Sequence, residues 1–380
     1  MTALRYALRA RALSLSLIAV GTICLSGVAS PVHAAGSATV GGSQLTQDGV
    51  IVNLAPGVPA PPAMPGASFL IADLDTGQIL AARAPHARHL PASTLKTLTA
   101  LTLIPRLKLT AKVMVLPADV RVEGSRIGIL AGTEYTVQSL FQGLLMASGN
   151  DAAYALARAN GGVAVTLEEM NATAAQLGAL DTLARDPSGL DQPGETSSAY
   201  DLALIGRAAM KLPSFRSYVS TKTASFPGGR SSDGKMLPGF KINNHNRLLF
   251  NYDGAVGIKN GYTIAAKQTF IAAATRGGKT YIVTELSSAN GSWRPTAAIL
   301  DWAFAHGPSL TPIGELVEPG TARLAAGGPG TSGAGGVDQQ GAAGSARPLG
   351  LPPWVGVAGL LGGVALVGSW AARRISRRRS

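Results

Sequence analysis

Hydrophobic residues recur with two different periods along the middle of the chain. Two apolar runs, 68–73 and 78–82, flank the turn residues Asp75, Thr76 and Gly77, which predicts a β-hairpin. Apolar residues three and four positions apart predict five helices, over 93–104, 137–146, 152–159, 167–177 and 199–211. Strand-like runs return at 256–263, 268–275 and 279–287. Strands at both ends of a helical middle predict one mixed sheet with a helical insert, an α/β (α+β) domain.

The N-terminal segment has a different pattern. Residues 1–34 carry three arginines, an apolar run over 12–28 and small residues before position 35, as a secretory signal peptide does. An uncleaved anchor helix is the alternative, but the apolar run is short for a span and ends in a cleavage-like sequence. We expect the mature chain to begin near Ala35.

The C-terminal segment predicts a membrane anchor. Residues 354–372 contain no charge, and as a helix they would cross the roughly 30 Å hydrocarbon core of a bilayer. Trp354 and Trp370 stand at the two ends of this stretch, and the arginine-rich residues 373–380 follow it. This order predicts a single-pass protein of the cell membrane, with a basic cytoplasmic tail and everything before Trp354 on the extracytoplasmic side.

Segments rich in Gly, Ala and Pro separate these ends from the folded part. We expect residues 35–66 to be a flexible leader, 67–307 the catalytic domain and 308–353 a linker. The short distance between domain and linker leaves no room for an additional β-rich C-terminal module.

Charge and cysteine content exclude several classes of function. The formal charge is +12, but eight arginines in the first eleven and last eight residues leave only +4 between them. A nucleic-acid partner is therefore not expected. The one cysteine, Cys24, lies in the predicted signal peptide, so the mature chain should hold no disulfide, thiolate metal site or cysteine nucleophile. No metal or other cofactor is expected.

The candidate chemistry begins with Ser93 and Lys96. At the start of a helix this spacing places both side chains on one face, close enough for the amine to take the hydroxyl proton. Taken alone, the pair also fits a helix-capping serine beside a surface lysine. Two later segments change that balance: Ser148-Gly149-Asn150 interrupts a helical pattern, and Lys259-Asn260-Gly261 lies on a predicted strand.

These three segments resemble, in order, the SxxK, SxN and KTG boxes of penicillin-binding proteins and serine β-lactamases. Within that group the chain is most similar to the serine-type D-alanyl-D-alanine carboxypeptidases, over about residues 67–305. The resemblance rests also on flanking segments, which are 91–96, 144–153, 170–178, 188–191 and 244–246. It implies the penicillin-binding fold, a mainly antiparallel sheet flanked by helices, with a helical subdomain that carries Ser148 and Asn150.

The resemblance also implies a mechanism. Ser93 attacks the carbonyl of a terminal D-Ala-D-Ala bond, with Lys96 as base, and an acyl-enzyme forms. Lys96 must then be desolvated or placed near Lys259, because an ordinary lysine is protonated at neutral pH. Ser148 relays the proton, and Asn150 holds Lys96 and the substrate amide.

The strand box implies the remaining contacts. Backbone N–H groups of Ser93 and Tyr262 would form the oxyanion hole, and Gly261 would leave room for a substrate lying along the strand edge. The implied partners are the peptidoglycan stem peptide, β-lactam antibiotics as acylating inhibitors, and the lipid bilayer through the C-terminal helix.

One residue departs from the family pattern. Asn260 stands where the family usually has threonine or serine, whose hydroxyl helps to bind the terminal carboxylate of the substrate. An amide also donates hydrogen bonds, and Thr263 offers a nearby hydroxyl.

Two other functions remain open. A serine β-lactamase needs a carboxylate to activate water, and Glu168 and Glu169 mimic one, although a solvated helix face fits their position better. A catalytically weak, peptidoglycan-binding homologue is the other alternative.

His86 and His89 are three residues apart but flanked by prolines, which argues against a metal pair.

Overall fold

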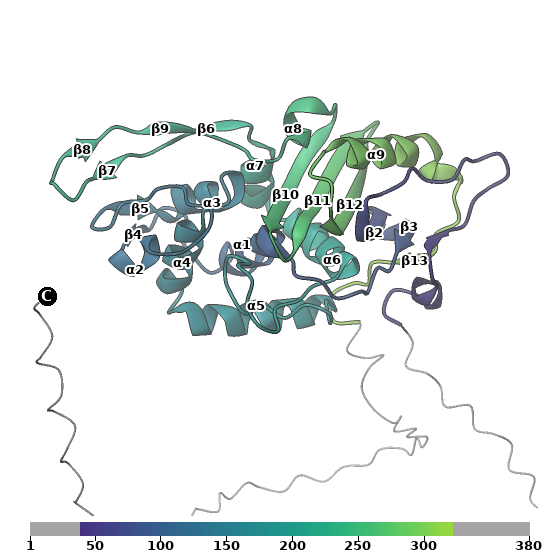
Figure 1. Ribbon diagram of the computed structural model, residues 1–380, viewed down its shortest axis with the longest axis horizontal. Helices are drawn as coiled ribbons and strands as arrows, with labels where there is room; N and C mark the ends of the chain where they lie inside the picture. Colours follow the sequence, from purple (N-terminus) through teal and green to yellow (C-terminus); the bar gives the residue numbers. More distant parts are fainter. Residues whose placement is uncertain (1–38, 322–380) are drawn as a thin grey trace, which may run out of the picture. The chain divides into compact units, whose positions relative to one another are not determined.

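The computed structural model describes residues 39–321, and its central element is an antiparallel sheet (Figure 1). Six strands follow the order β1-β3-β2-β12-β11-β10, and β13 pairs with β3. Their bounds are β1 (Val50–Val52), β2 (Gly66–Asp73), β3 (Gln78–Arg83), β10 (Ala255–Thr263), β11 (Lys267–Arg276), β12 (Lys279–Ser288) and β13 (Gly314–Glu315). The predicted hairpin and the three late strands are therefore present, and the late strands leave β10 as the last strand of the ladder.

Both faces of the sheet are covered. Along β2, Leu70 and Ala72 point into one apolar cluster, whereas Phe69 and Ile71 point into the other, as the two-residue period of a strand requires. Helix α6 (Ala199–Ala209) packs on the first face and α9 (Arg294–His306) on the second. The alternating pattern thus builds three layers, with the sheet in the middle (Figure 1).

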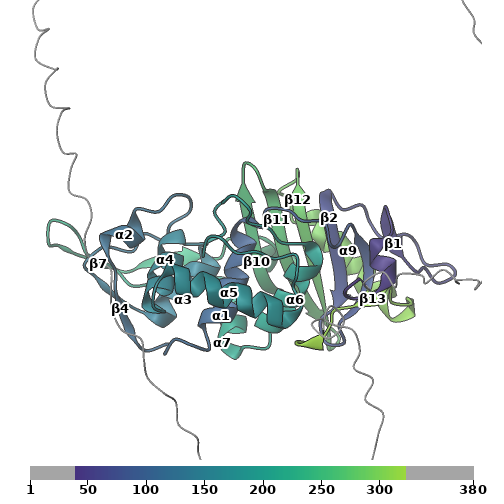
Figure 2. The same ribbon diagram turned by 90° about the horizontal axis from the view of Figure 1, so that it is seen from below.

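The remaining helices form a group beside the sheet (Figure 2). Their bounds are α1 (Lys96–Leu103), α2 (Pro117–Val120), α3 (Val137–Met146), α4 (Asn150–Ala159), α5 (Val163–Leu177) and α7 (Pro213–Ser220). Short strands β4 (Lys112–Met114) and β5 (Glu134–Thr136) pair within this group, and α8 (Leu248–Asn251) precedes β10. The five predicted helices are all present, the first of them as a 3-10 turn, η2 (Ala92–Leu95), that continues into α1.

The structure corrects the expected flexible leader over the part that it describes. Strand β1 pairs with β3, with Ile51 opposite Ala82, and Leu45 and Ile51 are buried. A 3-10 turn, η1 (Ser43–Thr46), precedes this strand. The high Pro and Gly content of residues 35–66 predicted no structure there, and the few apolar residues that form and precede β1 were too sparse to show a pattern. Strand β1 pairs with the outer edge of β3.

The boundary expected at residue 307 is also too early. A turn, η3 (Gly307–Ser309), and strand β13 follow α9, and Leu310, Ile313 and Leu316 are buried. The predicted signal peptide, most of the predicted linker, the predicted membrane span at 354–372 and the predicted tail lie outside the described residues. Among residues 39–321, no helix is both long and apolar enough to cross a membrane.

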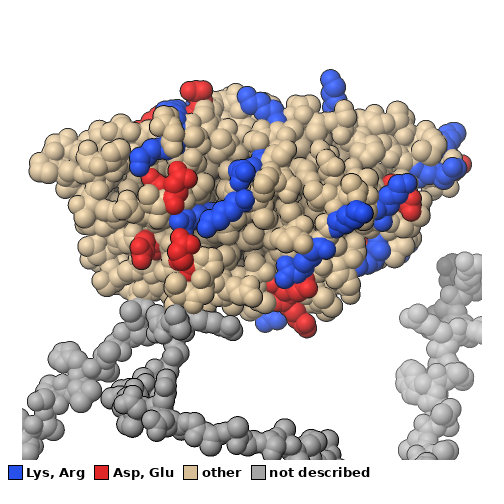
Figure 3. Space-filling view, turned by 180° about the vertical axis from the view of Figure 1, so that it is seen from behind, with Lys and Arg blue, Asp and Glu red and all other residues tan. Residues whose placement is uncertain are grey.

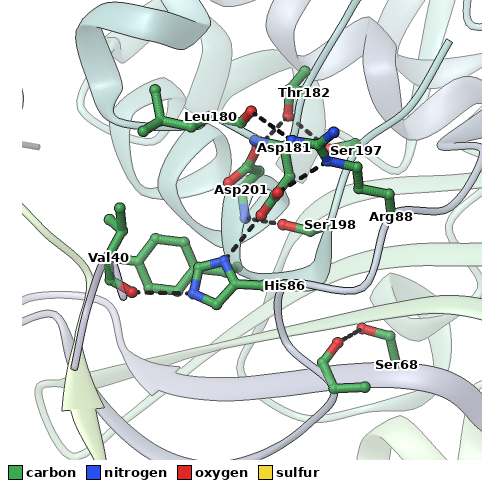
Figure 4. A network of polar contacts seen from close by, with 12 residues as sticks. Val40, Ser68, His86, Arg88, Leu180, Asp181, Thr182, Ser197, Ser198 and Asp201 are labelled. Carbon is green, nitrogen blue, oxygen red and sulfur yellow. Dashed lines mark hydrogen bonds and ion pairs between the residues drawn. The ribbon is translucent and has the colours of Figure 1, made fainter. Parts of the chain in front are cut away.

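A polar network ties the N-terminal segment to the helices (Figure 4). The His86 ring bonds through Nε2 to the Val40 carbonyl at 3.0 Å and through Nδ1 to Asp181 at 2.9 Å. Arg88 pairs with the same carboxylate, and the Asp181 N–H donates to Asp201. His86 therefore has a structural place in the domain, as a bridge between the loop that holds Asp181 and the chain that leads to β1.

Candidate active site

Ser93 lies in the turn η2, directly before helix α1. The preceding residue, Ala92, is buried and has a φ of 47°, in the left-handed region that non-glycine residues avoid. Gly189 sits so close to the Ala92 carbonyl that a Cβ there would overlap it. The turn is therefore held in an unfavourable conformation by its neighbours, as is common at functional sites.

Lys96 is buried at the first turn of α1, with its amine aimed at Ser93. Its Nζ lies 2.9 Å from Ser93 Oγ, 2.7 Å from Asn150 Oδ1 and 2.6 Å from the Ser188 carbonyl oxygen. The side chain is 0% exposed. Three partners use every hydrogen-bonding position that a lysine amine has.

The orientation of the Asn150 amide is determined by its second partner. Its Nδ2 donates to the Glu123 carbonyl at 2.7 Å, and a carbonyl can only accept. Oδ1 must then face Lys96. The backbone N–H of Asn150 also donates, to the Ser125 carbonyl at 2.8 Å, so the loop before β5 holds this residue at both ends.

Ser148 lies in the tight turn between α3 and α4. It is 5% exposed and has a φ of 60°, a second strained backbone position in the predicted boxes. The next acidic residue, Asp151, accepts hydrogen bonds from the backbone N–H groups of Ile127 and Gly128, at 3.0 and 2.9 Å. This carboxylate fixes the loop that packs over Asn150.

Alternate residues of strand β10 face either the buried interior next to Ser93 or a cavity open to solvent. Lys259 is buried, and Gly261 approaches Ser93 so closely that a Cβ would lie 2.8 Å from the Ser93 nitrogen. Only a glycine fits at this contact. Asn260 and Tyr262 alternate with these residues and line a cavity of about 450 Å³, together with His245, Arg247, Gln268 and Trp293.

Burial lowers the pKa of both active-site lysines, and the nearby Lys259 lowers that of Lys96 further. The pKa of Lys96 is well below its ordinary value, first because the amine is buried and second because Lys259 is nearby. Burial lowers the pKa of Lys259 to about 7. A large fraction of the Lys259 amine is therefore neutral near pH 7, and the lowered pKa of Lys96 favours its neutral form.

Ser188, from the segment 188–191, supports Lys96 from behind, together with Asp186 and Glu195, which the sequence analysis did not single out. The Ser188 carbonyl accepts from the amine, and the Ser188 N–H donates to Asp186 at 2.6 Å. Glu195 Oε2 accepts from the backbone N–H groups of Arg185 and Asp186, at 3.2 and 3.0 Å. Burial, together with the charge of Asp186, raises the pKa of Glu195 to about 8, so this acid is neutral at pH 7.

Other singled-out residues are engaged elsewhere. The Thr263 hydroxyl, which the sequence offered as a hydrogen-bond donor to the substrate carboxylate, donates instead to Asp191 at 2.9 Å. Glu169 lies on α5, pairs with Arg106 and accepts a hydrogen bond from Asn160. Arg247 was not predicted as a site residue, although it directly follows the segment 244–246, which resembles the family.

Comparison with known proteins agrees with this arrangement. A family model described as D-alanyl-D-alanine carboxypeptidase, of the S11 peptidases, matches residues 56–289. The chain is 42% identical over 266 residues to the D-alanyl-D-alanine carboxypeptidase DacB2 of Mycobacterium tuberculosis, covering 68% of this chain and 88% of that protein. It is 34% identical over 245 residues to a D-alanyl-D-alanine carboxypeptidase of a Streptomyces strain, covering 60% of this chain and 84% of the relative.

Solved structures give the same result. A crystal structure of a Mycobacterium tuberculosis D-alanyl-D-alanine carboxypeptidase aligns with a TM-score of 0.64 at 40% identity, over 70% of this chain and 99% of that one. The Streptomyces K15 DD-transpeptidase aligns with a TM-score of 0.61 at 32% identity, over 65% of this chain and 100% of that one. The predicted penicillin-binding fold is thereby confirmed. The chain belongs to the S11 family of serine peptidases, and it is a D-alanyl-D-alanine carboxypeptidase.

Proposed function

We propose that Ser93 is the nucleophile of a serine DD-carboxypeptidase that removes the terminal D-alanine from peptidoglycan pentapeptide. Ser93 Oγ forms an ester with the penultimate D-alanine carbonyl, and the peptide C–N bond breaks. The leaving amine takes a proton and departs as D-alanine. Water then hydrolyses the ester, and β-lactams acylate the same oxygen.

The observation that carries this proposal is the set of partners around Lys96 Nζ. Two of them, Asn150 Oδ1 and the Ser188 carbonyl, can only accept hydrogen bonds. A neutral amine has two N–H groups, which these acceptors use, and one lone pair. The lone pair is left facing Ser93 Oγ at 2.9 Å, the direction that general-base removal of the hydroxyl proton requires.

The lowered pKa values support the same role. A base that works near neutrality needs a pKa far below that of an ordinary lysine, and burial and the nearby Lys259 both lower the pKa of Lys96. When Lys96 accepts the Ser93 proton, repulsion from Lys259 favours its release again. Ser148, in the strained turn before Asn150, would relay this proton to the leaving nitrogen.

The contact between Gly261 and Ser93 supports the placement of the oxyanion hole. The Ser93 nitrogen lies against β10, so its N–H and that of Tyr262 are candidates to donate to the developing oxyanion. A substrate strand would add along β10 in this arrangement.

We assign recognition of the substrate carboxylate to the cavity beside β10. A carboxypeptidase substrate ends in a permanent anion, whereas Lys259 has a pKa of about 7 and supplies only a partial charge. Arg247 lines the cavity next to Asn260, is exposed, and has no ion pair among residues 39–321. A guanidinium stays charged and can bind a carboxylate through two parallel hydrogen bonds.

The location of the enzyme is part of the proposal. The uncharged segment 354–372 and the arginines after it support a single-pass anchor in the bacterial cell membrane, with the catalytic domain on the extracytoplasmic side. A tethered domain suits a substrate that is itself fixed in the cell wall.

Release of D-alanine from a synthetic pentapeptide tests the reaction. We expect release by the full chain and none by Ser93→Ala. A labelled penicillin separates the two classes of enzyme, because a bound lifetime of minutes or longer supports a carboxypeptidase. A lifetime of milliseconds would instead identify a β-lactamase.

A further inference from the structure

A long hairpin extends from the helical part of the molecule and takes no part in the active site described above. Strand β6 (Thr223–Phe226) pairs with β9 (Phe240–Asn243), and β7 (Gly229–Arg230) pairs with β8 (Met236–Leu237). We call residues 223–243 the projecting hairpin. In Figure 1 it runs above α3 and β5 to the end of the molecule that lies farthest from α9.

One side of the projecting hairpin is fixed to the helical part. Phe226 is 1% exposed and stacks on Tyr135, with ring centroids 5.7 Å apart. The Arg230 N–H donates to Thr133 Oγ1 at 2.9 Å, close to the tip. These contacts hold the hairpin in place along its length.

The arm that returns from the tip is open to solvent and contains large apolar residues. Every residue from 232 to 241 is exposed. Met236 is 67% exposed, Leu237 44% and Phe240 41%. Phe240 lies opposite Phe226 in the strand register, and its ring centroid is 5.5 Å from that of Phe226, so one side of the Phe240 ring is covered. Met236 and Leu237 follow one another on β8 and therefore point to opposite faces of the hairpin near its tip. The tip region thus exposes large apolar side chains on both faces, and exposed apolar surface of this kind marks an interaction site.

Cations surround the apolar residues. Arg230, Lys235 and Lys241 lie on the projecting hairpin, and all are exposed. The one acidic residue among 223–243 is Asp233, which pairs with Lys235 at 3.2 Å. Between residues 207 and 294 the chain has thirteen Lys and Arg against three Asp and Glu. Figure 3 shows that Lys and Arg side chains outnumber Asp and Glu side chains on the face opposite to the view of Figure 1.

We propose that the projecting hairpin docks on an anionic lipid surface, with Met236, Leu237 and Phe240 entering the headgroup region. Basic residues next to exposed apolar residues are the combination that binds at a membrane interface. A water-soluble anionic polymer would attract the same cations but would gain nothing from the three apolar side chains. The observations therefore favour lipid over a wall polymer.

Docking at this point would orient the catalytic domain with respect to the membrane. None of the hairpin residues has been placed in the catalytic machinery, so the proposal stands independently of the acyl-enzyme mechanism. It also uses no property of segment 354–372. Loss of lipid contact and loss of peptidase activity are separate results.

A fluorescent label on the hairpin tests the proposal in the full chain. A Cys24→Ser background provides a single labelling site through Met236→Cys, which receives an environment-sensitive fluorophore. The protein is added to bilayers of phosphatidylglycerol and phosphatidylcholine whose acyl chains carry bromine, a short-range quencher. Val165→Cys on α5 is the matched control, because Val165 is also apolar and 42% exposed.

We expect a blue shift and bromine quenching at position 236, and neither at position 165. The equilibrium between docked and undocked hairpin, read from the quenching, should shift by about tenfold toward the undocked form in Lys235→Glu with Lys241→Glu, or at high salt, because each cation contributes electrostatically at the surface. Penicillin acylation should be unchanged in both variants, which verifies folding.

Three results would overturn the proposal. Absence of quenching at position 236 would show that the hairpin does not enter lipid. Equal quenching at positions 236 and 165 would show that the membrane contacts the domain without using the hairpin. A response to soluble poly(glycerol phosphate) with no bromine quenching would identify a phosphate polymer as the partner.

Discussion

Replacing Gly261 with alanine should separate the strand from the nucleophile without unfolding the domain. The added Cβ would lie 2.8 Å from the Ser93 nitrogen and 3.0 Å from the Thr94 nitrogen, and it would overlap Thr269 Oγ1. The first two neighbours are backbone atoms of the turn η2, so they cannot rotate away as a side chain can.

The size of the displacement follows from these contacts. Ordinary van der Waals contact begins near 3.4 Å, so β10 and Ser93 must separate by about 0.6 Å or more in a closely packed interior. A misplacement of about 1 Å at reacting groups costs on the order of 10²-fold in rate, and loss of one oxyanion donor costs about 10²- to 10³-fold. We expect acylation by penicillin to slow by about 10²-fold in Gly261→Ala.

Stopped-flow measurement of acylation with a fluorescent penicillin gives this rate directly. Gly277→Ala is the control, because position 277 has no atom within 4 Å of the added Cβ although its φ is also positive. Circular dichroism establishes that both variants are folded. A folded Gly261→Ala protein that acylates at the wild-type rate would refute the proposed close approach of strand and nucleophile.

Three further outcomes follow from the same site. The rate of acylation should rise with pH as Lys96 loses its proton. Lys259→Met should move this rise to higher pH, because removing a neighbouring cation raises the pKa of Lys96. An unchanged pH–rate profile in Lys259→Met would contradict the coupling between the two lysines. Glu195→Gln should keep near-normal acylation because an amide oxygen accepts the same two N–H bonds, whereas Glu195→Ala leaves them unsatisfied and should slow acylation by about tenfold. Equal loss in both variants would show that the acid acts in another way. Arg247→Ala should lower kcat/KM by about 10- to 100-fold for a peptide ending in a carboxylate and leave a C-terminal amide unaffected, and the same loss for both peptides would refute the assigned carboxylate contact.

The boxes at Ser93, Ser148 and Lys259 could be located from the sequence because chemistry restricts both residue type and local spacing there. Periodicity predicted a sheet with a helical insert, since β2, α3 and β12 have long and regular apolar patterns. It predicted a mixed sheet, which is wrong, because every strand pair of the central sheet is antiparallel. The antiparallel sheet and the penicillin-binding fold were implied by the family resemblance. Strand β1 was missed because only Leu45 and Ile51 of its neighbourhood are buried, which is too few for a pattern to show.

The support behind Lys96 could not be predicted for a different reason. The Ser188 and Glu123 contacts are made by backbone carbonyls, which every residue possesses and which no side-chain motif reports. Glu195 resembles any other acidic residue in the sequence. Its neutrality at pH 7 comes from burial and from Asp186, both of which depend on tertiary structure.

Intact-protein mass spectrometry after brief exposure to benzylpenicillin tests the central claim most directly. We predict that the full chain gains the mass of one penicilloyl group, that peptide mapping places this group on Ser93, and that Ser93→Ala gains nothing. An adduct on another residue, or an unchanged adduct in Ser93→Ala, would contradict the assignment of Ser93 as the nucleophile.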